Sequence, residues 1–296
     1  MDILNRVTKV YHTSKEISFD DSSRIILMSD CHRGDGSWAD DFSKNENIYS
    51  AALNYYFENG YTYIELGDGD ELWENRNFDR IVEAHIDVFK VLSNFHKEDR
   101  LYFIYGNHDI VKRNEKFVMK NLYKYFDELE NIYKPLFPNI KVYEGLVLKY
   151  KVTNDKILLT HGHQVDFLNY DLWRLARFLV RYLWRPLELF GANGLMRTAK
   201  NHKKKDLVAK RLSEWVVKEK HMLITGHNHR PMYPRLNEPP YFNSGSCVHP
   251  NCITGIEIAD GKIMLIKWCT KTKDDGTLFI RRDILAGPRK IKELFN

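Results

Sequence analysis

The sequence predicts an α/β fold of two packed sheets with helices outside them and one helical insertion. Short apolar runs, typical of buried strands, alternate with longer periodic segments that are typical of helices. The first three of these runs each end at a Gly, Asp or Asn cluster. One helical segment, residues 166–215, also differs from the rest of the chain in its charge.

Strands are expected at Arg24–Ser29, Tyr61–Leu66 and Leu101–Tyr105, with helices at Asn45–Asn59 and Phe78–His96 between them. This alternation implies a parallel, doubly wound unit. In such a unit ligands bind at the carboxyl ends of the strands. The polar clusters of this sequence follow those ends.

The second half of the chain continues the α/β pattern. Its expected strands are Ile140–Tyr143, Leu146–Tyr150, Lys156–Thr160, His221–Thr225, Cys252–Ile258 and Lys262–Trp268. Its helical segments run from Val165 to about Phe190 and from Lys203 to Lys220, separated by a break at Gly191–Gly194. We therefore predict a catalytic domain of residues 1–165 and 216–296, interrupted by a basic, apolar helical insertion of residues 166–215.

Composition favours a soluble, cytoplasmic protein. Of the 296 residues 43% are hydrophobic and 29% charged, which predicts a buried core and argues against disorder. The first residues lack the apolar core of a signal peptide, and no apolar run is long enough to cross a bilayer. The four cysteines have neither zinc-site spacing nor the density of a disulfide framework, which fits a reducing compartment.

The basic residues are concentrated in one place. Although the net charge is only +5, residues 174–211 contain eleven Lys or Arg against two acids. This local excess indicates an anionic substrate or surface at the insertion.

Chemically reactive residues gather in six short motifs. They are Asp30-Cys31-His32, Gly67-Asp68, Gly106-Asn107-His108-Asp109, His161-Gly162-His163, Gly226-His227-Asn228-His229 and, least specific, Asn243-Ser244-Gly245-Ser246. The proposed metal ligands among them are Asp30, His32, Asp68, Asn107, His161, His227 and His229. Carboxylate, amide and imidazole donors without thiolate suit borderline divalent ions such as manganese, iron or zinc better than calcium. We expect two such ions, with manganese favoured over iron or zinc.

Spacing suggests how these ligands share ions. Asp30 and His32 are two residues apart at a strand end, as are His227 and His229, so each pair is expected on one face. Asp68 stands alone and is expected to bridge two ions. In two-metal sites a metal-bound hydroxide attacks phosphorus in line.

Several neighbouring residues are candidates for supporting roles. His108 is the expected catalytic histidine, acting on the leaving oxygen, and Asp109 is expected to set its tautomer. Arg33 is either a substrate ligand or part of an ion pair. Asp70 and Glu71 are either solvated or support the metal site, and His163 is either a supporting or a turn residue.

The ordered series Asp-x-His, Gly-Asp, Gly-Asn-His-Asp, His-Gly-x and Gly-His-x-His resembles the calcineurin-like metallophosphoesterase superfamily. The resemblance implies a four-layer αββα sandwich. It assigns Asp30, His32, Asp68 and His229 to one ion. It assigns Asp68, Asn107, His161 and His227 to the other, with His108 catalytic.

A narrower, partial resemblance points to UDP-diacylglucosamine pyrophosphohydrolases. Glu71 and Trp73 follow Asp68 as in their Gly-Asp-x-x-Glu-x-Trp stretch, and a basic apolar helical lid lies between the same motifs. The sequence departs from that pattern at His108, where those enzymes have Arg, and at His163, where they have Asp.

Within the insertion, Arg174, Arg177, Arg181 and Arg185 fall on one helical stripe beside an apolar stripe of leucines. The first three are candidate substrate-binding residues for a phosphorylated amphipathic ligand, and peripheral contact with the inner face of the membrane is a further expectation. In the alternative, the leucines pack on the catalytic domain and the arginines are solvated.

We therefore expect a metal-dependent phosphoester hydrolase acting on a small-molecule phosphomonoester, diester or nucleotide-linked pyrophosphate. A protein Ser/Thr phosphatase is one alternative. A nuclease is another, although nucleic acid is a less favoured partner because no nucleic-acid-binding motif is present.

Overall fold

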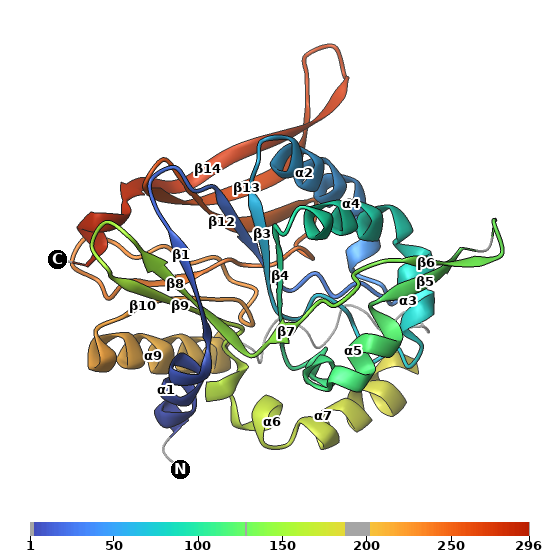
Figure 1. Ribbon diagram of the computed structural model, residues 1–296, viewed down its shortest axis with the longest axis horizontal. Helices are drawn as coiled ribbons and strands as arrows, with labels where there is room; N and C mark the ends of the chain where they lie inside the picture. The colour runs from blue at the N-terminus through green and yellow to red at the C-terminus, as the bar shows by residue number, and fades with distance from the viewer. Residues whose placement is uncertain (1–2, 128, 187–201, 296) are drawn as a thin grey trace.

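The computed structural model describes residues 3–127, 129–186 and 202–295. Two large mixed sheets pack face to face, with helices on their outer surfaces (Figure 1). The strand order is β14-β13-β12-β2-β3-β4-β7 in one sheet and β1-β8-β9-β10-β11 in the other. This arrangement confirms the predicted α/β sandwich.

The seven-stranded sheet combines a parallel and an antiparallel half. The parallel half contains β2 (Ile25–Met28), β3 (Thr62–Leu66), β4 (Leu101–Ile104) and β7 (Val142–Tyr143). The antiparallel half contains β12 (Cys252–Ala259), β13 (Lys262–Thr272) and β14 (Leu278–Lys290), and β12 pairs with β2. The parallel unit expected from the first half of the sequence is therefore present.

The five-stranded sheet contains β1 (Lys15–Phe19), β8 (Gly145–Tyr150), β9 (Lys156–Thr160), β10 (Met222–Thr225) and β11 (Tyr241–Asn243). Only β8 and β9 pair antiparallel; the other neighbours are parallel. As a result β3, β9 and β10, which precede three of the motifs, bring the residues that follow them to one end of the sandwich (Figure 1).

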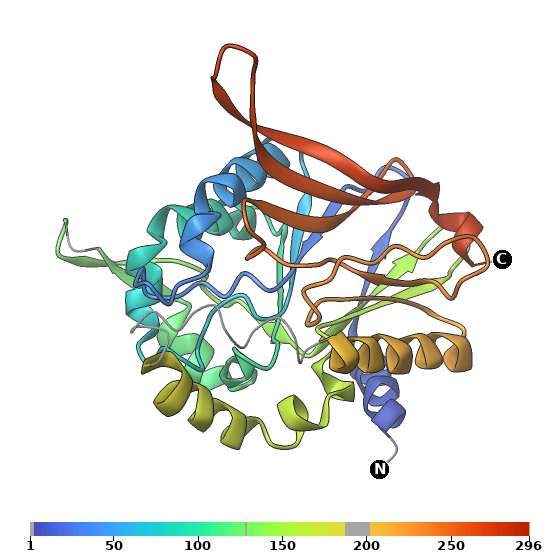
Figure 2. The ribbon, with the colours of Figure 1, turned by 180° about the vertical axis from the view of Figure 1, so that it is seen from behind.

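Alternation along the strands separates the layers. In β2, Ile25 and Leu27 lie in the apolar core between the sheets, whereas Ile26 and Met28 face the helices. The helices on that side are α2 (Glu46–Glu58), α3 (Phe78–Ala84), α4 (Ile86–Lys97) and α5 (Glu115–Asn121). The opposite face of the sandwich is covered by α1 (Ile3–Thr13) and α9 (His202–Glu219), as Figure 2 shows from behind.

Several elements were not predicted. They are α1, β1, α5, β11, β14, the hairpin of β5 (Lys124–Asp127) and β6 (Ile132–Pro135), and the short 3-10 turns Phe42–Lys44, Ile110–Arg113 and Ile291–Leu294. Most are short or face solvent, so they carry little apolar periodicity. None of the described helices is long and apolar enough to span a bilayer.

One predicted helix is divided in two. The segment Phe78–His96 forms α3 and α4, which meet at His85. The buried His85 ring contacts Asp40 Oδ2 at 2.8 Å and Glu46 Oε1 at 3.1 Å. These two carboxylates are distant in sequence, so hydrophobic periodicity alone could not show the break.

The insertion is less regular than predicted. A 3-10 turn (His163–Val165), α6 (Phe167–Tyr170), α7 (Trp173–Leu179) and a π-helical turn (Val180–Trp184) replace the single helix expected from Val165. Residues 187–190 of the predicted helix and the predicted break at Gly191–Gly194 lie outside the described residues.

The predicted end of the insertion at residue 215 falls inside α9. The buried α9 side chains Leu212, Trp215 and Val216 pack with residues of β8, β9 and β10. At least this part of α9 therefore belongs to the sandwich by its packing. The division of the chain into a domain and an insertion stays a prediction.

Candidate active site

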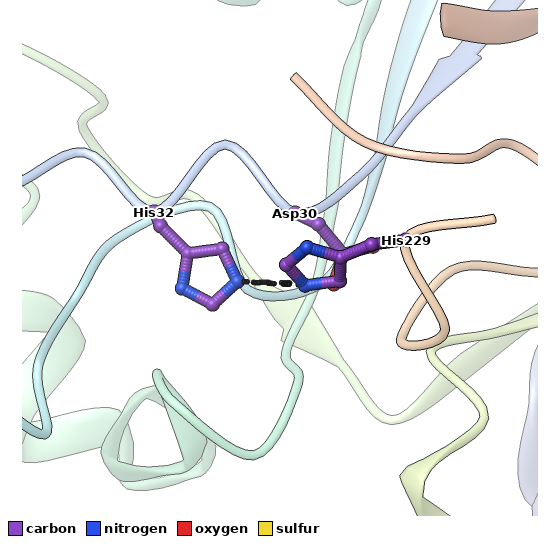
Figure 3. Close-up of side chains that lie close together, drawn as sticks. All are labelled: Asp30, His32 and His229. Carbon is purple, nitrogen blue, oxygen red and sulfur yellow. Dashed lines mark hydrogen bonds and ion pairs between the residues drawn. The ribbon is translucent and has the colours of Figure 1, made fainter. Parts of the chain in front are cut away.

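Three proposed ligands meet where β2 and β10 end. Figure 3 shows Asp30, His32 and His229 turned toward one another. The Nε2 atoms of His32 and His229 are 3.2 Å apart, and His229 Nε2 lies 3.1 Å from Asp30 Oδ1. These atoms form one of the groups in the described chain that could hold a metal ion.

A second group adjoins the first. One donor atom each from Asp68, His161 and His227 lie within 4.8 Å of one another. Asp68 Oδ2 is 3.1 Å from His161 Nε2 and 3.9 Å from His32 Nε2, so the Asp68 carboxylate lies between the two groups. This is the position that a bridging ligand requires.

The backbone at these ligands is strained. Positive φ angles of 48–68° occur at Asp30, His32, Asp68, His227 and His229. Such left-handed conformations cost roughly 1–3 kcal/mol each in non-glycine residues and concentrate at functional sites. The expected convergence therefore comes from left-handed turns beyond the strand ends, and not from the strand alternation that the spacing suggested.

Two glycines permit the close approach of these turns. A Cβ atom on Gly106 would lie 2.1 Å from Asp68 Oδ1, and one on Gly226 would lie 2.6 Å from Asp30 Oδ2. Any side chain at either position would displace a proposed ligand. The glycines thus make room for ligand carboxylates.

Hydrogen bonds orient the imidazoles. His161 Nδ1 donates to the Leu66 carbonyl at 2.8 Å, and His32 Nδ1 donates to Glu71 Oε2 at 2.7 Å. Each bond leaves Nε2 unprotonated and available as a ligand atom, as is usual for metal-binding histidines.

The donor set fits a cation. Among the buried polar atoms of the described chain that lack a hydrogen-bond partner are Asp30 Oδ1, Asn107 Oδ1 and His161 Nε2. Buried polar atoms normally make hydrogen bonds, so three ligand atoms without one in a single site indicate a missing positive partner. Although burial works to lower it, Asp68 and Asp30 raise the pKa of His161 to about 9, which shows that the site attracts positive charge.

The predicted role of Asp109 is wrong. Its carboxylate accepts from the backbone N–H of Gly106 at 2.6 Å and from Lys112 Nζ at 2.8 Å. It therefore braces the loop that carries Asn107. His108 Nδ1 instead donates to Glu71 Oε1 at 2.8 Å.

Glu71 thus supports both a proposed ligand and the proposed catalytic histidine. Burial opposes its ionisation, but His108 and His32 hold the pKa of the Glu71 carboxyl well below its usual range. The ring of Trp73 stacks on His108 with centroids 4.2 Å apart. The sequence left the role of Glu71 open, because nothing local shows whether an acid beside Asp68 is buried.

Of the two roles expected for Arg33, substrate contact is wrong, and an ion pair is found, although it is buried. Its side chain is buried, donating to both oxygens of Glu65 at 2.8 and 3.0 Å and from Nε to Asp70 at 2.7 Å. Asp70 also pairs with buried Lys112 at 2.6 Å. These pairs form a buried ionic network beside the site.

The insertion arginines occupy different positions from those expected. The guanidinium groups of Arg174 and Arg177 lie over the Trp173 ring, 5.5 and 4.9 Å from its centroid. Arg181 donates to the backbone carbonyls of Trp73 and Leu72 at 2.7 and 2.8 Å. Its two bonds to protein carbonyls count against the predicted direct contact of Arg181 with substrate.

The apolar side of the insertion faces solvent, which contradicts the alternative that its leucines pack on the catalytic domain. We call this surface the insertion stripe: Leu168, Leu172, Leu175, Phe178, Leu179, Tyr182 and Leu183, each 39–57% exposed.

A cavity of about 460 Å³ opens over the ligands. Its walls include His108, His227, Lys204 and Lys205. Asp166, which the sequence motifs did not single out, contacts His227 Nε2 at 3.2 Å and Lys204 Nζ at 2.8 Å. The buried His163 ring lies 5.5 Å from that of His161 between centroids. Asp166 therefore holds the His227 imidazole from the cavity wall, and the role of His163 stays a prediction.

Residues 23–231 match the calcineurin-like phosphoesterase family. No curated protein matches the sequence. The solved structure of Vps29 from Chaetomium thermophilum is similar over 89% of this chain and 96% of that one, with a TM-score of 0.38 and 12% identity.

The family match spans well over half of the chain and includes all seven proposed ligands. The chain therefore belongs to the calcineurin-like phosphoesterase family, and it is a metal-dependent phosphoester hydrolase.

Proposed function

We propose that the protein uses two divalent cations to hydrolyse a phosphate ester or pyrophosphate bond of an anionic small molecule. The observation that carries this proposal is the set of buried ligand atoms without a hydrogen bond on Asp30, Asn107 and His161, near the carboxylate of Asp68. A single cation would leave one of the two adjoining ligand groups unsatisfied.

Each cation would have four protein ligands. Asp30, His32, Asp68 and His229 would hold one, and Asp68, Asn107, His161 and His227 the other, with manganese favoured over iron or zinc for this oxygen and imidazole set. When bound, such a pair supplies a nucleophile at neutral pH and stabilises charge on the phosphoryl oxygens.

The surrounding residues bind and orient the substrate. His108 lines the cavity with its Nδ1 engaged by Glu71, so in the protonated ring Nε2 is the nitrogen free to donate to a leaving oxygen. Lys204 and Lys205 in the same wall attract a phosphate. Arg174 and Arg177 stay candidates for contact with a larger substrate at the edge of the insertion.

The size of the cavity favours a small molecule over a protein or nucleic acid, since about 460 Å³ is typical of small-ligand sites. The exposed insertion stripe adds an apolar surface close to this cavity, to which Val180 of the same segment contributes. An amphipathic phosphorylated substrate fits both features.

An assay with manganese tests the substrate class. We expect release of product from p-nitrophenyl phosphate, its bis-ester or a nucleotide-diphosphate sugar, and little activity on a phosphoserine peptide or on single- or double-stranded DNA. Protein treated with EDTA is the control for metal dependence. Turnover of the peptide or DNA alone would instead support a protein phosphatase or a nuclease, and no turnover of any substrate would contradict the proposal.

We further propose that the protein is cytoplasmic and that the insertion stripe contacts the inner face of the membrane. Basic residues beside exposed leucines are typical of interfacial helices. Replacing Leu175 and Phe178 by serine should weaken sedimentation with phosphatidylglycerol vesicles several-fold.

The matched control for this experiment replaces Leu129 and Leu278, which are 99% and 67% exposed elsewhere on the surface. Equal sedimentation of both double variants would contradict membrane contact through the stripe.

A further inference from the structure

The insertion grips one short loop of the sandwich. The loop is Leu72–Glu74, which follows β3, and all three of its carbonyl groups accept from insertion arginines. Arg181 donates from Nε to Trp73 at 2.7 Å and from Nη2 to Leu72 at 2.8 Å, while Arg185 donates from Nη1 to Glu74 at 2.8 Å. Arg185 is itself held by Asp35 Oδ2 at 2.6 Å.

That loop in turn holds His108. The Trp73 ring lies nearly parallel to the His108 ring, at an interplanar angle of 23° and a centroid distance of 4.2 Å. Glu71, immediately before the loop, accepts from His108 Nδ1 and also from the backbone N–H groups of Trp73 and Glu74 at 3.2 and 3.3 Å. A shift of the loop would therefore move both contacts that fix the imidazole.

Arg181 lies close to several other arginines. Burial, followed by the charges of Arg177, Arg76 and Arg185, lowers the pKa of Arg181. A solvated charged face would spread such groups apart, because like charges repel. Here two guanidinium groups are instead turned toward backbone carbonyls, which lack a formal charge but accept charge-assisted hydrogen bonds.

We propose that Arg181 is a positioning residue for His108, acting through the Leu72–Glu74 loop and the ring of Trp73. The inference rests on the proposed role of His108 as donor to the leaving oxygen. It gives the insertion a part in the reaction besides substrate contact, since the insertion keeps the His108 ring in its working orientation.

Arg181→Met tests the link because it keeps most of the side-chain length and removes the donors. We expect kcat for phenyl phosphate to fall about tenfold with little change in KM, since misplaced catalytic groups produce losses of this order. The fall should be smaller for p-nitrophenyl phosphate, whose better leaving group needs less protonation. Arg80→Met, an exposed arginine of α3, is the matched control and should behave as the wild type.

The deciding measurement repeats Arg181→Met in a His108→Asn background. If Arg181 acts through His108, the second substitution adds less than about a twofold loss, because residues that act as a unit are not additive. A further tenfold loss in that background, or a change confined to KM, would overturn the proposal.

Failure of the proposed function and failure of the positioning role give different results. Arg181→Lys, which retains the charge but lacks the planar fork that reaches both carbonyls, should give an intermediate loss and replaces Arg181→Met if that variant does not fold. Wild-type protein inactive on both substrates would count against the proposed function. Active wild type with an unaffected Arg181→Met variant would count against the positioning role alone.

Discussion

Replacing Asp68 by asparagine is expected to reduce hydrolysis by on the order of a thousandfold or more, because it removes the negative charge that the two proposed cations would share. Asp68 is 1% exposed and lies within 3.9 Å of imidazole nitrogens from both ligand groups. Asp68 Oδ1 also accepts from the backbone N–H of His108 at 2.7 Å. The amide has nearly the same shape, so the variant isolates charge from packing.

The measurement is kcat/KM on p-nitrophenyl phosphate together with the number of manganese ions bound per chain. We expect the variant to bind fewer ions while its circular dichroism spectrum stays that of the wild type. Asp275→Asn, an exposed position in the β13–β14 hairpin, is the charge-matched control. A variant at Asp68 that keeps near-normal turnover would disprove the bridging assignment.

Glu71→Gln is expected to lower activity by about a hundredfold, because an amide has one acceptor oxygen where the carboxylate has two. In the wild type, Glu71 accepts from His32 Nδ1 at 2.7 Å and from His108 Nδ1 at 2.8 Å. The variant must leave one imidazole without its acceptor. Freeing His32 would weaken metal binding, whereas freeing His108 would lower kcat at saturating metal.

Titrating manganese while measuring kcat separates the two effects. We expect both the manganese affinity and kcat to fall in Glu71→Gln, since loss of such supporting bonds commonly costs about 10–100-fold in metal affinity or activity. Glu71→Asp, which keeps two oxygens on a shorter stem, should lose less. Glu83→Gln on the exposed face of α3 is the control. Unchanged manganese affinity and unchanged kcat would show that Glu71 supports neither histidine.

Local chemistry explains why candidate metal ligands can be selected from the sequence. Each proposed ligand follows a strand with a strong apolar signal, and the glycine-bounded motifs recur in order from Asp30 to His229. Metal binding needs particular residue types at particular chain positions, so the pattern can be recognised in the sequence alone. The parallel pairing of β2, β3 and β4 was predictable from the alternation of short apolar runs with helical segments.

The wrong predictions concern charged residues, which occur both in substrate-binding sites and in buried ion pairs. Arg33 and Asp109 stand beside ligands, yet both are buried in ion pairs or loop contacts, with Lys112 as a shared neighbour of their network. Proximity in sequence does not reveal which way a side chain turns when the backbone enters a left-handed turn. The acids Glu71 and Asp166 contact His32 and His227, which are distant from them in the chain, so the sequence did not show these contacts.

The sequence by itself determined the fold class, the family and the set of metal-ligand candidates, because strand periodicity and donor chemistry are written in local residue patterns. Only the tertiary structure decided which acid orients His108, that Arg33 is buried, and that Arg181 reaches the loop carrying Trp73. These contacts join residues from separate elements, and their geometry depends on how the two sheets and the insertion pack together.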